Sequence, residues 1–364
     1  MWQDQNIQAK YSRESAPRLM MQKDMFPVND AFKQYLIAYD RDVELPILYQ
    51  DLVNYSYAKS LKDKKGKWTL WENAVYEPRA LAILKVALIK TYLALKKNAF
   101  PAGAGQLDIE CIDFCDYGNS MPFRVTVINK DNGQLDFFYV KQADASRIYG
   151  LELEHLLSEH PINFLHHEHT LVEAHIAGTP GDVFLQLQPL ETWEMQALAK
   201  AFVHFNENCF VRLLGDMRSY NFVVVPSPGR EPAYLIRAID FDQQCYEGRK
   251  SFYFPRFYKE NEAYVQLVLQ HLSALEIEQT REAGFDQMAV KIITYRRRLM
   301  ELLNSMVNDD ISENFKIQML RNELNEHFET TRFSGCKTMG AILKQQLKQV
   351  LRKHVQLAGI RERG

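Results

Sequence analysis

The chain has 364 residues, of which 46% are hydrophobic and 25% are charged, a balance typical of a globular protein with room for two or three domains. Its formal net charge is −2 and its pI is near 6.6, so composition gives no sign of the basic surface that nucleic acid or an anionic membrane requires. We therefore expect neither nucleic acid nor a membrane as a partner.

The cysteines and the N-terminal residues bear on the compartment. The five cysteines lack the paired CxxC spacing of zinc ribbons and redox motifs. No apolar run reaches the roughly 18 residues that span a bilayer, and the start MWQDQNIQAKYSRES has no signal-peptide core. These features predict a cytoplasmic protein with reduced thiols.

Residues 1–104 are expected to form a helical N-terminal extension. The stretch RALAILKVALIKTYLAL repeats apolar residues at helical spacing, for example at Leu84 and Leu88. The segment PAGAG at 101–105 interrupts this pattern with two glycines and a proline. We therefore place a domain boundary there.

Residues 105–188 predict an antiparallel sheet with one helix. Three strands are expected in LDIECIDFCDY, FRVTVIN and QLDFFYVKQ, and the turn residues KDNG between the last two indicate a hairpin. A helix follows in ASRIYGLELEHLLSEH, and then an apolar strand, TLVEAHI, which ends at the loop AGTPGD. The order is strand, strand, strand, helix, strand.

Residues 189–364 predict a mainly helical domain, which makes the fold class α+β. A helix is expected in ETWEMQALAKAFVHFNEN, and helices return after about residue 260. Between them, FVVVP and YLIRAIDFD can pair as a hairpin. This hairpin would bring Asp216 and Asp240 to neighbouring strand ends.

The loop GDMRSYN and the strand end AIDFD contain residue types suited to phosphoryl transfer. This chemistry needs a divalent metal held by carboxylate and amide oxygens, a cation on the phosphates, and a carboxylate that orients the attacking hydroxyl. Asp216 stands five residues before Asn221, and the following hairpin returns to Asp240. The spacing therefore predicts one site that contains all three side chains.

With these residues in place, positions 105–270 resemble the protein-kinase-like superfamily, nearest the branch of aminoglycoside and choline phosphotransferases and HipA-type kinases. The resemblance implies a two-lobed fold, with residues 105–188 as the N-lobe and 189–364 as the C-lobe. It implies that Asp216 orients the acceptor hydroxyl and that Asn221 and Asp240 bind the metal. Arg218 is similar to the basic residue that many protein kinases place near the transferred phosphate.

The first half of this region matches the superfamily in the order of its motifs. The turn DYGNSMP looks like the phosphate-covering loop, in which Gly118, Ser120 and nearby backbone amides would contact phosphate. Lys141 in FFYVKQ looks like the third-strand lysine that binds the phosphates. Its partner on the following helix would be Glu152 or Glu154, and we prefer Glu152 because the apolar face of the helix continues one turn later.

The segment LVEAHIAGTPGD resembles the strand and hinge that hold adenine through main-chain groups, here near Ala174 and Ile176. Two departures stand out. The turn GNSMP has one glycine instead of several, and Leu214 occupies the position two residues before Asp216 where the phosphotransferase branch usually has a histidine. The usual support of the catalytic loop is therefore missing.

The resemblance implies a phosphotransferase that uses ATP and magnesium, with nucleotide and the hydroxyl of a small molecule or protein as partners. The two departures favour an alternative, a catalytically silent scaffold that binds nucleotide or a protein partner. A helical adaptor with an embedded sheet is a third possibility, which scattered positions of Asp216, Asn221 and Asp240 would favour. The histidines of HHEH, at 166, 167 and 169, are expected in a surface loop, because adjacent strand residues point in opposite directions and no fourth metal ligand is evident.

Overall fold

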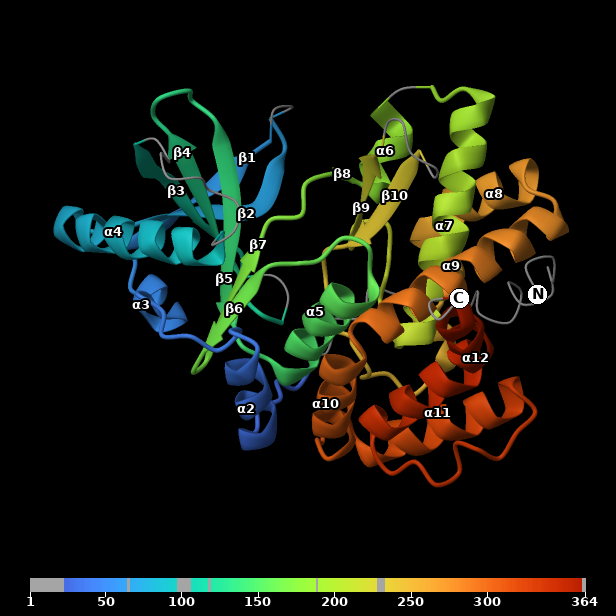
Figure 1. Cartoon of the computed structure of the whole chain (residues 1–364). Helices are drawn as coiled ribbons and strands as arrows, with labels where there is room; N and C mark the ends of the chain where they lie inside the picture. The colour runs from blue at the N-terminus through green and yellow to red at the C-terminus, as the bar shows by residue number, and fades with distance from the viewer. Residues whose placement is uncertain are drawn as a thin grey trace. The chain divides into compact units, whose positions relative to one another are not determined.

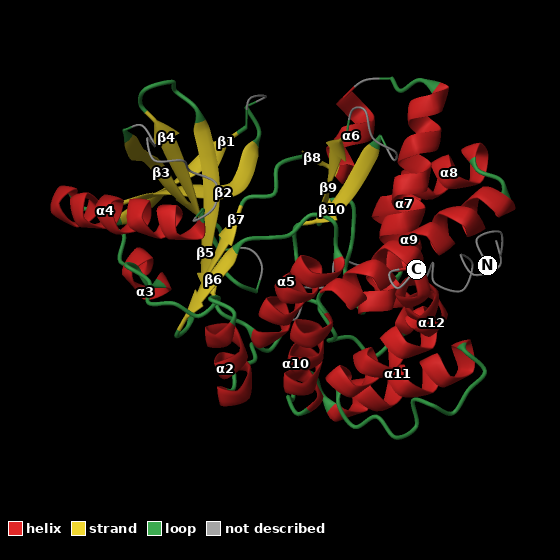
Figure 2. Ribbon diagram, in the orientation of Figure 1, coloured by secondary structure: helices red, strands yellow, loops and turns green. Residues whose placement is uncertain are grey.

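The computed structural model describes residues 23–63, 66–96, 106–116, 119–187, 189–227 and 233–361 (Figure 1). Helices and strands both contribute, as Figure 2 shows, so the predicted α+β class is confirmed. The chain forms two compact units. The sheet unit comprises Met25–Ile176 and Arg297–Ile311, and the helical unit comprises Met1–Asp24, Ala177–Arg296 and Ser312–Gly364.

The sheet unit contains a seven-stranded sheet in which every neighbouring pair is antiparallel. In order across the sheet, the strands are β1 (Tyr57–Lys62), β2 (Trp68–Val75), β3 (Leu107–Phe114), β4 (Phe123–Asn129), β5 (Leu135–Gln142), β7 (Thr170–Ala174) and β6 (Phe164–His167). The predicted strands β3, β4, β5 and β7 are confirmed, as is the hairpin between β4 and β5. Gly133 in its turn has a φ of 70°, a left-handed conformation that glycine adopts without steric cost.

Helix α4 (Pro78–Leu95) covers one face of this sheet. Alternate residues of β4 and β5 point toward it and are buried, including Val125 and Val140, both fully inaccessible to solvent. Leu88 and Tyr92 of α4 lie in the same core. The predicted helix in this region is therefore confirmed, and its apolar stripe is a core face.

Four further helices belong largely to the sheet unit: α2 (Asp30–Ala38), α3 (Tyr49–Val53), α5 (Ala145–Leu157) and α10 (Arg296–Val307). The predicted helix α5 is confirmed, and the Asp144 carboxylate caps its N-terminus by accepting from the Arg147 amide. The Tyr149 hydroxyl of α5 donates to Asp309 at 3.0 Å and shares a 3.0 Å hydrogen bond with Ser305. These bonds tie α10 to α5 although the two helices lie far apart in sequence.

The expectation of a purely helical extension over 1–104 is wrong. Strands β1 and β2 lie within it and lengthen the sheet, since β2 pairs with β3. The sheet unit accordingly comprises Met25–Ile176 together with Arg297–Ile311, so it matches neither the boundary at 104 nor the one at 188. Trp68 and Leu70 of β2 are 67% and 60% exposed, so its apolar residues did not mark a buried face.

The helical unit contains the long helix α7 (Thr192–Arg212), and the sequence predicted this helix. It also contains a three-stranded sheet in the order β10 (Tyr234–Ala238), β9 (Phe222–Pro226) and β8 (Thr179–Pro180), so the predicted hairpin of β9 and β10 is confirmed. The other helices are α6 (Gly181–Leu187), α8 (Glu262–His271), α9 (Ala274–Thr294), α11 (Asn314–His327) and α12 (Met339–Arg361), with 3₁₀ turns η2 (Lys250–Tyr253), η3 (Pro255–Phe257) and η4 (Lys259–Asn261).

Aromatic side chains form much of the core of the helical unit. The rings of Phe202 and Tyr264 stack at 5.2 Å between centroids, and Phe205 meets Phe222 of β9 edge-on at 5.1 Å. The Tyr264 hydroxyl donates to the Gly181 carbonyl at 2.7 Å. Across the described residues, none of the helices combines the length and apolarity needed to cross a bilayer.

Candidate functional site

The loop that carries Asp216 begins where α7 ends. Leu213 closes the helix in a left-handed conformation, with φ 54°, and Asp216 has a similar φ of 55°. The Asp216 amide donates to the Phe252 carbonyl at 3.3 Å and to the Tyr258 hydroxyl at 3.0 Å. These bonds fix a backbone conformation that L-residues rarely adopt.

Asn221 and Asp240 lie beside this aspartate, as predicted. The side-chain Nδ2 of Asn221 donates to the Asp216 main-chain carbonyl at 2.7 Å and to the Asp216 carboxylate Oδ2 at 3.3 Å. The Ile239 amide donates to the Asn221 carbonyl at 3.0 Å, which brings the strand end with Asp240 next to Asn221. The Asp240 carboxylate in turn accepts from the Asp242 amide at 3.1 Å. The three predicted side chains therefore gather in one place within the helical unit.

Burial raises the pKa of Asp216 to about 6, from its ordinary value of 3.8. The hydrogen bond and charge of Arg218 oppose this effect, whereas the neighbouring Asp240 and Glu260 carboxylates add to it. The Asp216 side chain is 19% exposed, so water reaches it only in part. A carboxylate with a pKa this close to neutrality can accept a proton and release it again.

Arg218 bonds to carboxylates on two sides. Its Nε donates to Asp216 Oδ1 at 2.7 Å, and its Nη1 donates to Glu260 at 2.6 Å. The guanidinium also lies over the ring of Tyr258, 4.8 Å from the centroid. The predicted basic residue is thus next to Asp216, and Glu260, which the sequence did not indicate, holds its other side.

The chemistry of this group suits a magnesium ion. The Asn221 side chain donates through Nδ2 to Asp216, which leaves its Oδ1 as the atom that can bind a cation. Magnesium is usually held by one or two carboxylates together with substrate phosphates, so the side chains that would hold it here are the Asp240 carboxylate and the Asn221 amide oxygen. In the described part of the chain, no three His, Cys, Asp or Glu side chains form a metal cage.

In the sheet unit, Lys141 of β5 pairs with Glu173 of β7. Lys141 Nζ donates to Glu173 Oε2 at 2.8 Å, and Arg147 of α5 donates to both oxygens of the same carboxylate, with Nη2 at 2.9 Å from Oε2. Burial alone would raise the pKa of Glu173, but the charges of Arg147 and Lys141 outweigh it and lower the pKa to about 2. Glu173 is therefore a fixed negative charge between two cations.

The prediction that Glu152 is the partner of Lys141 is wrong. Glu152 is fully buried and accepts hydrogen bonds from Tyr35 at 2.6 Å, from Arg41 at 3.3 Å and from Arg298 at 2.6 Å. The α5 residue that bonds to Glu173, the partner of Lys141, is Arg147 and not Glu152. A charged residue inside the apolar strand TLVEAHI was the signal that could have identified Glu173.

Of the expected phosphate-covering turn, Gly118 lies outside the described residues. The Ser120 carbonyl accepts from the Gln142 amide at 3.3 Å, and the Ser120 side chain is buried. Met121 follows with a φ of 39°. Ser120, in the described part of the turn, therefore lies beside the end of β5, where Gln142 follows Lys141.

The main chain of Ala174 is engaged within the sheet. Its amide donates to the Asn163 carbonyl at 3.0 Å, so it is not the free donor that the resemblance implies for adenine. The next amide, of His175, donates to the Phe137 carbonyl at 3.3 Å. Ile176 makes no main-chain hydrogen bond to any described residue, so of the two predicted positions it is the one whose amide and carbonyl remain available.

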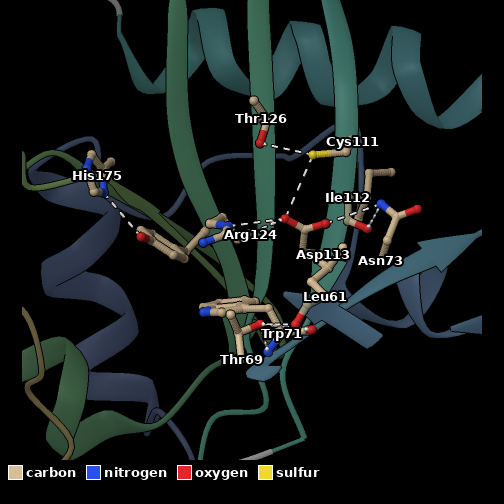
Figure 3. A network of polar contacts seen from close by, with 11 residues as sticks. Leu61, Thr69, Trp71, Asn73, Cys111, Ile112, Asp113, Arg124, Thr126 and His175 are labelled. Atoms are coloured by element: carbon tan, nitrogen blue, oxygen red, sulfur yellow. Dashed lines mark hydrogen bonds and ion pairs between the residues drawn. The ribbon is translucent and has the colours of Figure 1, made fainter. Parts of the chain in front are cut away.

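A row of polar side chains crosses the sheet on the face opposite α4. Cross-strand neighbours join Asn73, Asp113, Arg124, Tyr139 and Glu173 in this order. Asn73 Nδ2 donates to Asp113 Oδ1 at 3.2 Å, and Arg124 Nη2 lies 2.7 Å from Asp113 Oδ2 (Figure 3). Since side chains alternate along a strand, Lys141 lies on the same face as Tyr139.

Aromatic rings and a thiol complete this row (Figure 3). The Arg124 guanidinium lies over the ring of Trp71 at 4.5 Å, and the Tyr139 hydroxyl lies 3.1 Å from His175 Nδ1. The Cys111 thiol donates to the Thr126 hydroxyl at 3.2 Å. These contacts join residues from different parts of the sheet, among them Tyr139 of β5, the strand that also carries Lys141.

The HHEH segment is not a surface loop throughout. His166 is buried in β6, and its Nδ1 lies 2.8 Å from the Asp42 carboxylate. His167 Nδ1 lies 3.5 Å from the other oxygen of Asp42. This pairing between β6 and the chain after α2 was hidden from sequence, because the two segments are more than 120 residues apart.

Among the described side chains, the predicted site residues belong to two charged groups, one around Asp216 in the helical unit and one around Glu173 in the sheet unit. Their chemistry has to be inferred from the residues themselves. No family model matches the chain, and no curated protein sequence matches it either.

Proposed function

We propose that the chain is an ATP- and magnesium-dependent phosphotransferase, which moves the γ-phosphate to a hydroxyl of a small molecule or protein. The proposal includes a two-lobed protein-kinase-like fold, with the sheet unit as the N-lobe and the helical unit as the C-lobe. The observation that supports it most is the grouping of Asp216, Asn221 and Asp240 within hydrogen-bonding and electrostatic reach of one another.

Asp216 is the residue that would orient the acceptor hydroxyl and accept its proton. With a pKa of about 6, its carboxylate is mostly ionised at pH 7 yet basic enough to take a proton as the hydroxyl attacks. Arg218 and Asn221 bond to this carboxylate and fix its orientation. The acceptor hydroxyl would therefore meet a positioned base, which is one of the parts that phosphoryl transfer uses.

Asn221 and Asp240 would hold magnesium, and Lys141 would bind the phosphates. A bound magnesium ion neutralises charge on the phosphates during transfer. Lys141 is oriented by Glu173, whose carboxylate it shares with Arg147. Ser120 and Ile176 remain candidates for the phosphate-covering turn and for the main-chain contact to adenine.

A catalytically silent scaffold is the second candidate, and particular observations favour it. Leu214 replaces the expected histidine, and the Ala174 amide is engaged in the sheet. Arg218 is bound to two carboxylates instead of facing an open phosphate position. Such a protein would bind nucleotide, or a protein partner, without transferring phosphate.

Calorimetric titration of ATP with and without magnesium separates these functions. Wild type should bind ATP in a magnesium-dependent way, and Asp240→Ala should lose this dependence because a metal ligand is gone. Asp310→Ala, at an exposed aspartate, is the control and should behave as wild type. Metal-independent binding in wild type would favour the scaffold, and no binding at all would refute the nucleotide assignment.

A further inference from the structure

The end of α7 and the segment after Asp240 form a short backbone ladder inside the helical unit. Leu214 and Gln244 form an isolated antiparallel bridge. The Gly215 amide donates to the carbonyl of the residue before Gln244 at 3.2 Å, and the amide of the residue after Gln244 donates to the Leu213 carbonyl at 2.8 Å. The ladder therefore joins the start of the Asp216 loop to the segment that follows Asp240.

The Gln244 side chain adds to this junction. It is 1% exposed, and its Nε2 donates to the Arg212 carbonyl at 2.6 Å and to the Leu213 carbonyl at 3.3 Å. The last carbonyls of a helix have no partner within the helix, so a buried donor at this place stabilises the helix end. Gln244 satisfies two of them directly before the Asp216 loop begins.

The backbone at this junction is strained, which makes such support necessary. Leu213, Asp216 and Cys245 are three of the seven non-glycine residues with positive φ in the described part of the chain. Backbone conformations of this kind persist only where the surroundings impose them, and they concentrate at functional sites. The Gln244 side chain bonds to two of the three, since its Nε2 donates to the Leu213 carbonyl at 3.3 Å and to Cys245 Sγ at 3.0 Å.

We infer that Gln244 is a positioning residue that sets the place of the Asp216 carboxylate relative to Asp240. The inference rests on the proposed phosphotransfer at this site. Gln244 lies four residues after Asp240, and its amide group bonds to carbonyls three and four residues before Asp216. It thereby supports the start of the Asp216 loop from the segment that follows the proposed metal ligand Asp240.

Gln244→Met tests this role, because it keeps the length of the side chain and removes the donor. We expect the turnover number for ATP hydrolysis, with water as acceptor, to fall at least tenfold, while the calorimetric Kd for ATP with magnesium changes less than twofold. Gln244→Asn, whose side chain is shorter by one methylene, is the milder second variant. It should also lower turnover, but by less than Gln244→Met does. It also serves if Gln244→Met does not fold.

Gln346→Leu is the matched control. Gln346 is also fully buried and donates from α12 to the Phe210 carbonyl of α7 at 3.4 Å, one turn away from the loop. Its loss should destabilise the helix end without changing turnover of the folded protein. Equal losses in the Gln244 and Gln346 variants would overturn the inference, as would unchanged turnover in Gln244→Met.

Amide hydrogen exchange decides the matter independently of nucleotide. In the free protein, Gln244→Met should speed exchange of the Gly215 and Asp216 amides at least tenfold, and Gln346→Leu should not. Unchanged exchange in Gln244→Met would refute the positioning role. If the wild type neither binds nor hydrolyses ATP, but Gln244→Met still speeds exchange of the Gly215 and Asp216 amides, the proposed function is refuted. Gln244 would then have a structural role in the loop.

Discussion

Glu173 in the sheet unit and Asp216 in the helical unit are both largely removed from water, yet their pKa values move in opposite directions. Two cations, Arg147 and Lys141, surround Glu173 and lower its pKa to about 2 despite burial. Asp216 has one cation, Arg218, and two carboxylate neighbours, so burial prevails and its pKa rises to about 6.

This difference separates a structural charge from one suited to chemistry. The Glu173 carboxylate stays ionised at any pH near neutrality, so its role is to fix the cations around it. Asp216 ionises at the expense of folding free energy, and shifts of this kind are concentrated at active sites. Substitutions at these two carboxylates, at their neighbours and at the buried Glu152 test this contrast, in order of decreasing expected effect.

Glu173→Gln should have the largest effect. It leaves two buried cations without their shared carboxylate, so we expect the free energy of unfolding to fall by about 3–5 kcal/mol. Urea denaturation at pH 7 measures this loss. Lys141→Met removes only one of the two cations and should cost less; an equal or larger loss would contradict the role assigned to Glu173.

The pH dependence of this loss follows from the direction of the pKa shift. The folded pKa of Glu173, about 2, lies below its ordinary value of 4.5, so its ionisation stabilises the fold above pH 4.5. That contribution disappears as pH falls toward 2. The difference between wild type and Glu173→Gln should therefore be constant above about pH 5 and shrink in more acidic urea titrations.

Glu152→Gln should destabilise the sheet unit by about 3 kcal/mol, because Arg41 and Arg298 would lose their buried counter-charge. Since Glu152 does not contact Lys141, the affinity of the folded protein for ATP with magnesium should not change. Urea denaturation and calorimetry on the same preparation test both statements. A nucleotide affinity reduced tenfold would show that Glu152 acts on the phosphate-binding lysine after all.

Local patterns in the sequence predicted much of the fold. Turn residues and alternating apolar residues identified the hairpin of β4 and β5 and the hairpin of β9 and β10, because both depend on neighbours in sequence. Strands β1 and β2 were missed, since Trp68 and Leu70 point to solvent and their pattern marks no buried face. The strong helical periodicity of α4 then dominated the interpretation of the whole N-terminal region.

The candidate site divides in the same way. Asp216, Asn221 and Asp240 were predictable because a loop and one hairpin bring them together. The pairing of Lys141 with Glu173 depends on β5 and β7 lying side by side after an intervening helix and strand, which no spacing in the sequence reveals.

Asp216→Asn should stabilise the protein while abolishing transfer. The folded pKa of about 6 lies above the ordinary 3.8, so ionised Asp216 costs stability above pH 6 and this cost vanishes below about pH 4. We expect a gain of about 1–2 kcal/mol in urea denaturation at pH 7, none at pH 4, and a loss of turnover of about 10²–10⁴-fold. A destabilised variant at pH 7 would mean that Asp216 is structural.

Arg218→Met should produce the smallest change, a shift in the pH dependence of turnover. In wild type, ATP hydrolysis should fall on the acidic side with an apparent pKa near 6, because protonated Asp216 accepts no proton. Arg218 lowers the pKa of Asp216, so its removal should move this acidic limb to higher pH, whereas Glu260→Gln removes a carboxylate that raises the pKa and should move the limb to lower pH. Limbs that coincide in all three proteins would assign the titration to a group other than Asp216. Opposite movements would show that the neighbours of Asp216, and not burial alone, set the pH at which it acts as a base.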